Sequence, residues 1–293
     1  MKIMITGCHG QLGNELQSIL KSMKSEIGPI PEQYRGAEIC AVDIDTLDIT
    51  DTLAVTEFVK SENPDIIINC AAMTNVDGCE TMQDVAYKVN AAGVRNLARA
   101  AKAVNAKFIH VSTDYVFAGN GTKPYTEWDI INPQSVYGAS KALGEKYALA
   151  FNDKTFIVRT SWLYGYIGKN FVKTVRRVIR EKGSITVVND QRGNPTNAND
   201  LAHHLLLLGI TEEYGIYHCT GEGECSWYEF ACEIARLSGF GDVVKPCTSD
   251  EYKSPTKRPE YSSLENLGLK CSVGNFMRDW KAALKDYINK VED

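Results

Sequence analysis

The sequence predicts an α/β protein in which a doubly wound parallel sheet carries a smaller C-terminal lobe. Three observations predict this fold. Short apolar strands alternate with amphipathic helical stretches, a glycine-rich turn follows the first strand, and the alternation becomes less regular after about residue 164. Strands that alternate with helices of this length are typical of parallel sheets with right-handed crossovers.

The first half of the chain is expected to hold most of the sheet. Strands are predicted, from apolar runs, at 2–6, 38–42, 66–69, 107–112 and 155–160. Helices are predicted, from apolar residues at helical spacing, at 12–23, 54–61, 84–104 and 137–151. Residues 21–37 interrupt this order, and because they contain Gly28-Pro29-Ile30-Pro31 we expect a surface insertion there.

The second half is expected to divide between the sheet domain and the smaller lobe. Helices are predicted at 171–181, 199–208, 227–237 and 275–290, strands at 185–188 and 214–220, and a loop at 246–263. We assign residues 1–164 and about 185–214 to the first domain, and about 165–184 and 215–293 to the second lobe. The strand at 214–220 is therefore expected in the second lobe.

Composition and charge exclude several classes of protein. The 293 residues are 44% hydrophobic and 24% charged, which is ordinary for a soluble globular protein. No stretch approaches the roughly 18 apolar residues of a membrane span. A net charge of −5 argues against general nucleic-acid binding. Nine scattered cysteines without a C-x-x-C pair predict reduced thiols in a cytoplasmic protein.

The glycine-rich turn Gly7-Cys8-His9-Gly10-Gln11-Leu12-Gly13 joins the first strand to the first helix. Glycines let the backbone turn sharply and approach a pyrophosphate, and a helix N-terminus offers unpaired N–H groups to an anion. The spacing differs from G-x-G-x-x-G, and a tight turn without a ligand is the alternative. Its position at the first strand-to-helix junction favours a dinucleotide site of the Rossmann type.

Such a site uses an acidic residue after the second strand to bind the adenine ribose. Asp43 is expected there and Asp45 is its rival, although both come later than the usual spacing of about 20 residues. The insertion at 21–37 accounts for the excess. Asp48 and Ile49 are expected to flank the adenine. Because no Arg or Lys follows the second strand directly, the sequence favours NADH, and NADPH stays open.

Tyr137 and Lys141 are four residues apart in a predicted helix, so their side chains share one face. An ammonium group held close would lower the tyrosine pKa from its ordinary value near 10, which suits proton transfer during a carbonyl reduction. The hydroxyls of Ser112 and Thr113 follow a strand, and one of them could polarise the substrate carbonyl. An exposed pair without function is the alternative for Tyr137 and Lys141.

The glycine turn, the Ser-Thr pair and the Tyr-x-x-x-Lys pattern together resemble the extended short-chain dehydrogenases/reductases. Further segments resemble the dTDP-4-dehydrorhamnose reductase family in particular, and the resemblance covers nearly the whole chain. The segments that carry it are 112–117 (STDYVF), 132–141 (NPQSVYGASK), 159–165 (RTSWLYG), 170–174 (NFVKT), 190–196 (DQRGNPT) and 257–262 (KRPEYS).

The resemblance implies that NAD(P)H reduces the C4 ketone of dTDP-4-dehydro-L-rhamnose to give dTDP-L-rhamnose. It implies Tyr137 as proton donor and Lys141 as its partner and ribose ligand. The first domain would bind the dinucleotide and the second lobe the nucleotide sugar. The residues implied at the cofactor are Gly7, Gly10, Gln11, Leu12, Gly13, Asp43, Asp48, Ile49, Ala72, Met73 and Thr74. Those implied at the substrate are Thr113, Asp114, Trp162, Asn170 and Arg258.

The sequence departs from this family at two points. Met73 stands where many members have His, so a polar role is lost there. Some members hold Mg²⁺ through glutamates at a dimer contact, which also implies a homodimer. Glu15 matches one such position, but the other ligands cannot be placed, and no metal ligand is predicted from the residues themselves.

Three other functions stay open. The chain could reduce or epimerise another nucleotide-linked 4-ketosugar. A dehydratase is disfavoured because Tyr115, and not a glutamate, follows Asp114. A non-catalytic regulatory subunit of the same fold is disfavoured because Thr113, Tyr137 and Lys141 are all present.

Several histidines and aromatic residues are expected to pack and not to bind ligands. His110 lies within a strand and is predicted to be in the core. His203 and His204 are adjacent on a helix and are predicted as packing and surface residues. Trp227 is at helical spacing from Phe230 and is predicted to pack the second lobe.

Overall fold

The computed structural model describes residues 1–252 and 254–291. A six-stranded sheet lies at its centre, in the order β12-β7-β6-β5-β1-β4, and every neighbouring pair is parallel. Its strands are β1 (Lys2–Thr6), β4 (Glu38–Val42), β5 (Ile66–Asn69), β6 (Lys107–Thr113), β7 (Thr155–Thr160) and β12 (Gly215–His218). The predicted fold class is confirmed.

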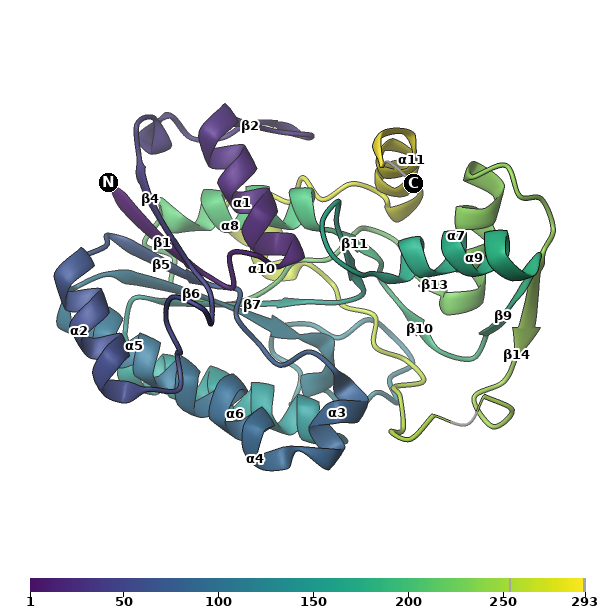
Figure 1. The fold of residues 1–293 in the computed structure, drawn as a ribbon, viewed down its shortest axis with the longest axis horizontal. Coiled ribbons are helices and arrows are strands. Elements are labelled where there is room, and N and C mark those ends of the chain that lie inside the picture. The colour runs from purple at the N-terminus through teal and green to yellow at the C-terminus, as the bar shows by residue number, and fades with distance from the viewer. Residues whose placement is uncertain (253, 292–293) are drawn as a thin grey trace.

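Helices cover both faces of this sheet (Figure 1). α1 (Gln11–Ser22) and α8 (Ala198–Gly209) lie on one face, and α2 (Thr52–Glu62), α5 (Val94–Ala103) and α6 (Val136–Phe151) lie on the other. The chain leaves β1 towards β4 and then crosses back to β5 on the opposite side of β1. Open α/β sheets bind ligands at the carboxyl ends of the strands beside such a reversal.

The central strands are apolar on both faces because both faces are covered. In β1, Ile3 and Ile5 belong to the core that includes residues of α1 and α8. Met4, which points the other way, belongs to the core that includes residues of α2 and α5. This explains why β1 and β5 have continuous apolar runs and no alternation of polar and apolar residues.

The helix predicted over residues 84–104 is interrupted. The structure has α4 (Gln83–Tyr87), a π-helical segment η2 (Lys88–Gly93) and then α5. Asn90 of η2 is buried, accepts a hydrogen bond from the Met73 amide (2.8 Å) and donates one to Ser140 Oγ (3.1 Å). The π segment, a feature often found at functional sites, therefore ties the loop after β5 to α6.

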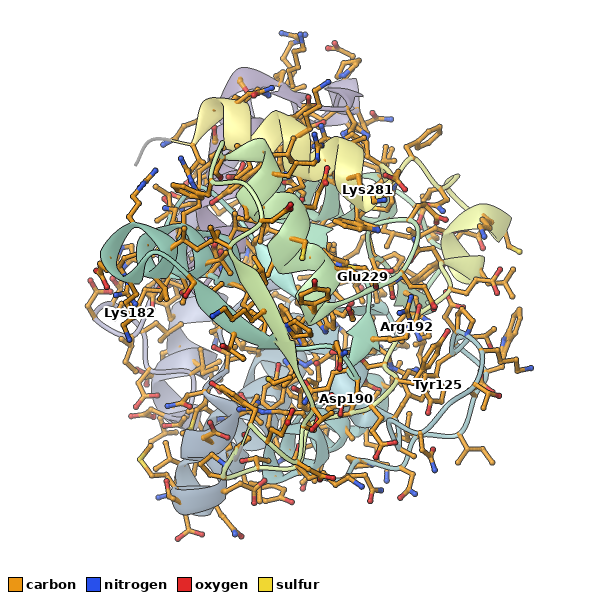
Figure 2. All side chains as sticks on the ribbon, turned by 90° about the vertical axis from the view of Figure 1, so that its right-hand side faces the viewer. Tyr125, Lys182, Asp190, Arg192, Glu229 and Lys281 are labelled. Carbon is orange, nitrogen blue, oxygen red and sulfur yellow. The ribbon has the colours of Figure 1, made fainter. Side chains whose placement is uncertain are left out.

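A smaller lobe has its own apolar core. It contains α7 (Phe171–Lys182), β9 (Ile185–Val188), α9 (Trp227–Leu237), β14 (Val244–Cys247) and α11 (Trp280–Lys290), and β9 pairs with β14. Figure 2 faces this lobe and labels Arg192 and Glu229, whose side chains form an ion pair of 3.2 Å. Short elements complete the chain: β2 (Lys24–Ser25), β3 (Gly28–Pro29), η1 (Glu32–Tyr34), α3 (Val76–Thr81), η3 (Asp114–Val116), β8 (Leu163–Tyr164), β10 (Arg192–Gly193), β11 (Thr196–Asn197), β13 (Cys225–Ser226) and α10 (Leu267–Cys271).

Three sequence-based assignments are corrected. The strand expected in the second lobe is β12, which pairs with β7 at the edge of the central sheet. β9, assigned to the first domain, pairs within the smaller lobe instead. The last helix begins only at Trp280, because the Asp279 side chain accepts hydrogen bonds from the first-turn amides and caps it there.

The limits of the two domains otherwise stay a prediction. No helix in residues 1–252 and 254–291 is long and apolar enough to cross a membrane.

Candidate active site

A pocket of about 970 Å³ lies at the carboxyl ends of the central strands and reaches the smaller lobe. Its size and position are typical of a ligand site in an open α/β sheet. Most of the predicted site residues line it together: Gly7, Gly10, Gln11, Leu12, Gly13, Asp43, Asp48, Ile49, Ala72, Met73, Thr74, Thr113, Asp114, Tyr137, Lys141 and Trp162. Asn170 and Arg258 are not part of this lining.

The glycine turn is shaped by close backbone approaches. Gly7 has φ +67°, and a Cβ there would lie 2.7 Å from the Ala71 amide nitrogen. A Cβ on Gly13 would lie 2.4 Å from the Gly7 carbonyl oxygen. No side chain caps the N-terminus of α1, and its first turn has no acidic residue. The first amides of α1 therefore face the pocket ready for an anion, as a pyrophosphate requires.

The carboxylate of Asp43 is held in place at the end of β4. Its Oδ2 accepts a hydrogen bond from the His9 amide and its Oδ1 accepts one from the Ile44 amide, both at 2.9 Å. Asp45 does not line the pocket. The geometry therefore favours Asp43 over Asp45 as the ribose ligand.

The side chains of Gln11 and Asn170 form hydrogen bonds that link the glycine turn to the loop before α7. Gln11 Oε1 accepts hydrogen bonds from the Gly165 amide (2.8 Å) and from Asn170 Nδ2 (3.1 Å). Asn170 also caps α7, because its Oδ1 accepts a hydrogen bond from the Lys173 amide (3.0 Å). The donor Nδ2 of Asn170 is thus in use, since it also donates to the Gly165 carbonyl oxygen (2.8 Å), and this disfavours Asn170 as a diphosphate ligand.

Arg258 lies at a neighbouring cavity of about 170 Å³. Its Nη2 forms an ion pair with Asp77 Oδ1 at 2.8 Å. Tyr115 lines both cavities, so Arg258 is separated from the main pocket by that residue.

The two hydroxyls after β6 have different partners. Ser112 Oγ donates to Glu145 Oε1 at 2.5 Å, and Glu145 is itself paired with Arg159 at 2.8 Å. Thr113 Oγ1 donates to Asp114 Oδ1 at 2.9 Å and accepts from the Tyr115 amide. Both hydroxyls therefore already donate to a buried carboxylate, and Thr113 is the better candidate to meet a substrate because it is also hydrogen-bonded with Tyr137.

Two polar atoms in the pocket lining are buried without a hydrogen-bond partner, namely Asp114 Oδ2 and Thr160 Oγ1. Burial raises the pKa of the Asp114 carboxyl to about 6. Buried polar atoms are normally paired, so these two indicate where a ligand would supply the missing partner. Sequence reasoning missed Thr160, whose only signal was its place at the end of a strand.

Tyr137 lies in the first turn of α6, where the Ser135 side chain caps the helix. A Cβ on Gly138 would lie 2.2 Å from the Tyr115 carbonyl oxygen, so glycine lets α6 approach η3 closely. Tyr137 and Tyr115 pack edge to face with ring centroids 5.4 Å apart. Burial raises the pKa of the Tyr137 phenol. A hydrogen bond with Thr113 lowers this pKa, but by less than burial raises it. The predicted lowering of this pKa is therefore wrong for the protein without a cofactor.

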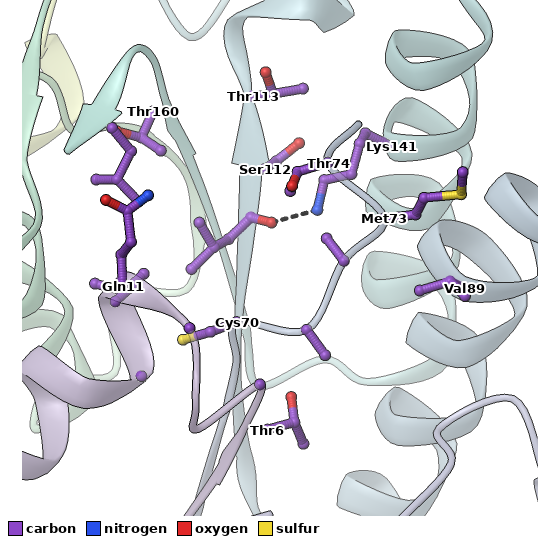
Figure 3. Close-up of a pocket in the computed structure, with 18 of the residues that line it drawn as sticks. Thr6, Gln11, Cys70, Met73, Thr74, Val89, Ser112, Thr113, Lys141 and Thr160 are labelled. Carbon is purple, nitrogen blue, oxygen red and sulfur yellow. Dashed lines mark hydrogen bonds between the residues drawn. The ribbon is translucent and has the colours of Figure 1, made fainter. Parts of the chain in front are cut away.

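Lys141 is buried beneath the pocket. Its Nζ donates to the Val111 carbonyl oxygen at 2.6 Å, the dashed line in Figure 3. Nζ also lies 3.5 Å from His110 Nε2. Burial lowers the pKa of the Lys141 amine to about 8. The amine therefore changes charge close to neutral pH.

Two tryptophans form a wall of the pocket. The rings of Trp162 and Trp227 stack with centroids 3.6 Å apart and an interplanar angle of 10°. Trp162 has φ +47°, a conformation rare for a bulky residue and one that concentrates at functional sites. A Cβ on Gly193 would lie 2.8 Å from the Trp162 ring, so glycine leaves room for it. Trp227, expected only to pack the lobe, lines the pocket.

Four of the five histidines are buried, namely His110, His203, His204 and His218. His110 is in the core, as predicted. His203 and His204 are both buried, so the predicted surface position is wrong. His203 Nδ1 is bonded to Ser25 Oγ of the β2–β3 hairpin (2.8 Å), which covers this part of α8.

Glu15 does not fit a Mg²⁺ site within one chain. It is buried, and its Oε2 accepts a hydrogen bond from Asn199 Nδ2 at 2.9 Å. The nearby carboxylates of Glu26 and Asp200 are both paired with Arg278, at 2.8 and 2.7 Å. Across the described ranges, the one cluster of three potential metal ligands is Cys8, His9 and Asp43, in the glycine turn.

Known proteins match this chain over its whole length. The family model for the RmlD substrate binding domain matches residues 1–293. A dTDP-4-dehydrorhamnose reductase of Aggregatibacter actinomycetemcomitans is 40% identical, with 97% of each chain covered. A crystal structure of a dTDP-4-dehydrorhamnose reductase ortholog from Clostridium acetobutylicum has a TM-score of 0.92 and 47% identity, with 99% of each chain covered. One from Bacillus anthracis, in complex with NADP, has a TM-score of 0.92 and 39% identity, with 99% of each chain covered. The chain therefore belongs to the dTDP-4-dehydrorhamnose reductase family.

Proposed function

We propose that this chain is an NAD(P)H-dependent oxidoreductase that reduces the C4 ketone of dTDP-4-dehydro-L-rhamnose to dTDP-L-rhamnose. One observation carries the proposal: Thr113, Tyr137 and Lys141 line the pocket between the glycine turn and the tryptophan wall. The glycine turn suits a dinucleotide pyrophosphate, and the wall suits the sugar nucleotide. The names of the relatives support this substrate class.

The residues present can perform the reduction in a defined order. The nicotinamide, when bound, supplies the hydride that adds to C4. Negative charge then develops on the ketone oxygen, and Tyr137 gives it the phenolic proton, which leaves an alcohol and a phenolate. The raised pKa of Tyr137 keeps this proton in place until that charge develops. We assign Thr113 to the same oxygen as a hydrogen-bond partner, and the charged form of Lys141 to the phenolate and the ribose.

The cofactor preference rests on Asp43. Its carboxylate suits the 2′-hydroxyl of NADH and repels the 2′-phosphate of NADPH. The Lys and Arg residues of the pocket lining are Lys141 and Lys169, and neither follows β4; His9 lies in the lining 3.8 Å from Asp43. We therefore expect NADH to be used, although one relative was crystallised with NADP. Oxidation of both cofactors should be measured, and activity with NADPH alone would contradict this preference.

The main test is cofactor oxidation with dTDP-4-dehydro-L-rhamnose, using dTDP-4-dehydro-6-deoxyglucose as the comparison substrate. Net oxidation with the first sugar supports the reductase, whereas epimerases and dehydratases recycle their cofactor. No oxidation with either sugar, from protein that binds the cofactor, would favour another 4-ketosugar or a regulatory subunit.

A variant separates the proton donor from the rest of the site. Tyr137→Phe is expected to lose turnover by about 100-fold or more, which is typical of a lost general acid, while the cofactor dissociation constant stays near that of the native protein. Tyr147→Phe, on the same helix but outside the pocket lining, is the matched control. Full activity in Tyr137→Phe would remove Tyr137 from the mechanism.

A further inference from the structure

A row of polar side chains crosses the central sheet beneath the pocket. Thr6 of β1 is the register partner of Asn69 of β5, and Asn69 is the partner of His110 of β6. Register partners point to the same face of a sheet, so the three side chains can touch. All three are buried, with exposed fractions of at most 1%. Buried polar groups at the centre of an apolar sheet require an explanation.

These side chains form a chain of hydrogen bonds that leads to Lys141. Thr6 Oγ1 donates to Asn69 Oδ1 (2.6 Å), and Asn69 Nδ2 is bonded to His110 Nδ1 (3.0 Å). On the other side of the ring, His110 Nε2 lies 3.5 Å from Lys141 Nζ. This series of hydrogen bonds thus begins beside the glycine turn and ends at the lysine of the active site.

The backbone fixes which groups donate and which accept in this series of hydrogen bonds. The Ala71 amide can only donate, and it donates to Asn69 Oδ1 at 3.1 Å. The oxygen of the Asn69 amide therefore faces Thr6 and Ala71, and its NH₂ group faces His110. An NH₂ group can only donate, so His110 Nδ1 accepts. Burial and the neighbouring Lys141 lower the pKa of His110 well below its ordinary value, so the ring is neutral and its proton is on Nε2.

This tautomer directs an N–H group at Lys141. An ammonium group has no lone pair, so it cannot accept a hydrogen bond from Nε2–H. A neutral amine can accept that bond and still donate to the Val111 carbonyl oxygen. The contact therefore favours the neutral form of Lys141 over the charged form.

We propose that Thr6, Asn69 and His110 are positioning residues that fix the His110 tautomer and thereby favour the neutral amine of Lys141. They act through Lys141: Thr6 lies in the pocket lining, whereas Asn69 and His110 do not. The consequence is a lysine that can change its charge near neutral pH, as a group that assists proton transfer must. That catalytic consequence depends on the proposed function, but the effect on Lys141 does not.

The other groups around Lys141 act in both directions. Burial lowers its pKa, whereas the charge of Glu145, one turn further along α6, raises it, as does Cys70 in the loop after β5. The His110 ring stacks on Phe108, with centroids 6.2 Å apart, which holds its plane. A change at His110 that keeps the ring site buried therefore alters one contact of Lys141 and leaves these groups in place.

The experiment compares two substitutions of one residue. In His110→Asn, the side chain still reaches the Asn69 NH₂ group but has no N–H near Lys141. In His110→Gln, the longer side chain places an N–H donor near the position of Nε2. The pKa of Lys141 is followed by NMR of ¹³C-labelled lysine in the ligand-free protein, with the signal assigned through Lys141→Arg.

We expect the native amine to titrate near pH 8. His110→Asn should raise that pKa by about one unit, the effect of about one hydrogen bond, and His110→Gln should keep it within a few tenths of the native value. His204→Asn is the control, because His204 is equally buried but contacts Asp200 and Phe276 and not Lys141. It should lower the melting temperature without moving the Lys141 pKa.

An unchanged Lys141 pKa in His110→Asn would overturn the proposal, as would a His110 ring that carries its proton on Nδ1 in ¹⁵N spectra. Since both measurements use the protein without ligands, they can fail while the proposed reduction is still observed. The expected Lys141 result can likewise be obtained while no reduction is observed, so the two proposals are tested separately.

Discussion

The buried ion pair between Glu145 and Arg159 offers a test of how the site is supported. Glu145 lies on α6, four residues after Lys141, and Arg159 lies on β7. Two guanidinium nitrogens of Arg159 donate to Glu145, at 2.9 and 2.8 Å, and both side chains are 3% exposed. Ser112 adds a third hydrogen bond, at 2.5 Å. Glu145→Ala would leave a guanidinium charge buried without its carboxylate.

The size of the effect follows from this burial. Breaking a buried ion pair by removing one partner costs about 3–5 kcal/mol, because the remaining charge stays desolvated. Each kcal/mol lost from the free energy of unfolding lowers the melting temperature of a protein of about this size by about 2–4 °C. The melting temperature of Glu145→Ala should therefore fall by about 6–20 °C. Replacing both partners, as Glu145→Met with Arg159→Met, should recover most of the loss, since no charge is then buried.

The assay is urea denaturation followed by circular dichroism. The control is Glu181→Ala, which breaks an ion pair of the same length (2.8 Å) whose side chains are 62% and 51% exposed. Exposed pairs contribute about 0–1 kcal/mol. If Glu145→Ala lost no more stability than Glu181→Ala, or if the double variant were less stable than Glu145→Ala, the reasoning from burial would be refuted.

Two further predictions concern the pocket itself. Gly13→Ala should weaken cofactor binding by tenfold or more, which corresponds to about 1.4 kcal/mol. The reason is that its Cβ would lie 2.4 Å from the Gly7 carbonyl oxygen, so the turn must open. Calorimetric titration measures the cofactor affinity, and an unchanged affinity would contradict the prediction. The contribution of Asp114 to native stability should fall as pH rises from 3.8 to about 6, because the folded state holds the Asp114 proton more tightly than the unfolded state. The stability of Asp114→Asn relative to the native protein should therefore rise over this pH range, by at most about 3 kcal/mol, and urea denaturation that gave the same difference between the two proteins at pH 4 and pH 7 would count against this.

Local sequence was sufficient for the features that depend on neighbouring residues. The glycine turn was predictable because Gly13 approaches Gly7 within one strand-to-helix junction, whereas the approach of Gly7 to Ala71 depends on the fold. Tyr137 and Lys141 were predictable because helical geometry places residues four apart on one face. The strands at the centre were predictable because burial on both faces requires continuous apolar runs.

Features that depend on distant partners were placed wrongly or missed. The strands at 185–188 and 215–218 are both short and partly apolar, and only their pairing with β14 and β7 decides which lobe each joins. Trp227 has the spacing of a core residue, and only its stacking on Trp162 brings it to the pocket. The direction of the expected tyrosine pKa shift was wrong because burial, which outweighs the Thr113 hydrogen bond, is a property of the whole fold.

The sequence by itself therefore determined the fold class and the family, and most of the site residues that it predicted line the pocket. The tertiary structure decided that the Ser112 hydroxyl donates to Glu145 and the Thr113 hydroxyl to Asp114, and that Asn170 and Arg258 lie outside the main pocket. It also decided that His110 contacts Lys141. The physical reason is that residue type and spacing fix local geometry, whereas hydrogen-bond partners and desolvation depend on segments that meet only after folding.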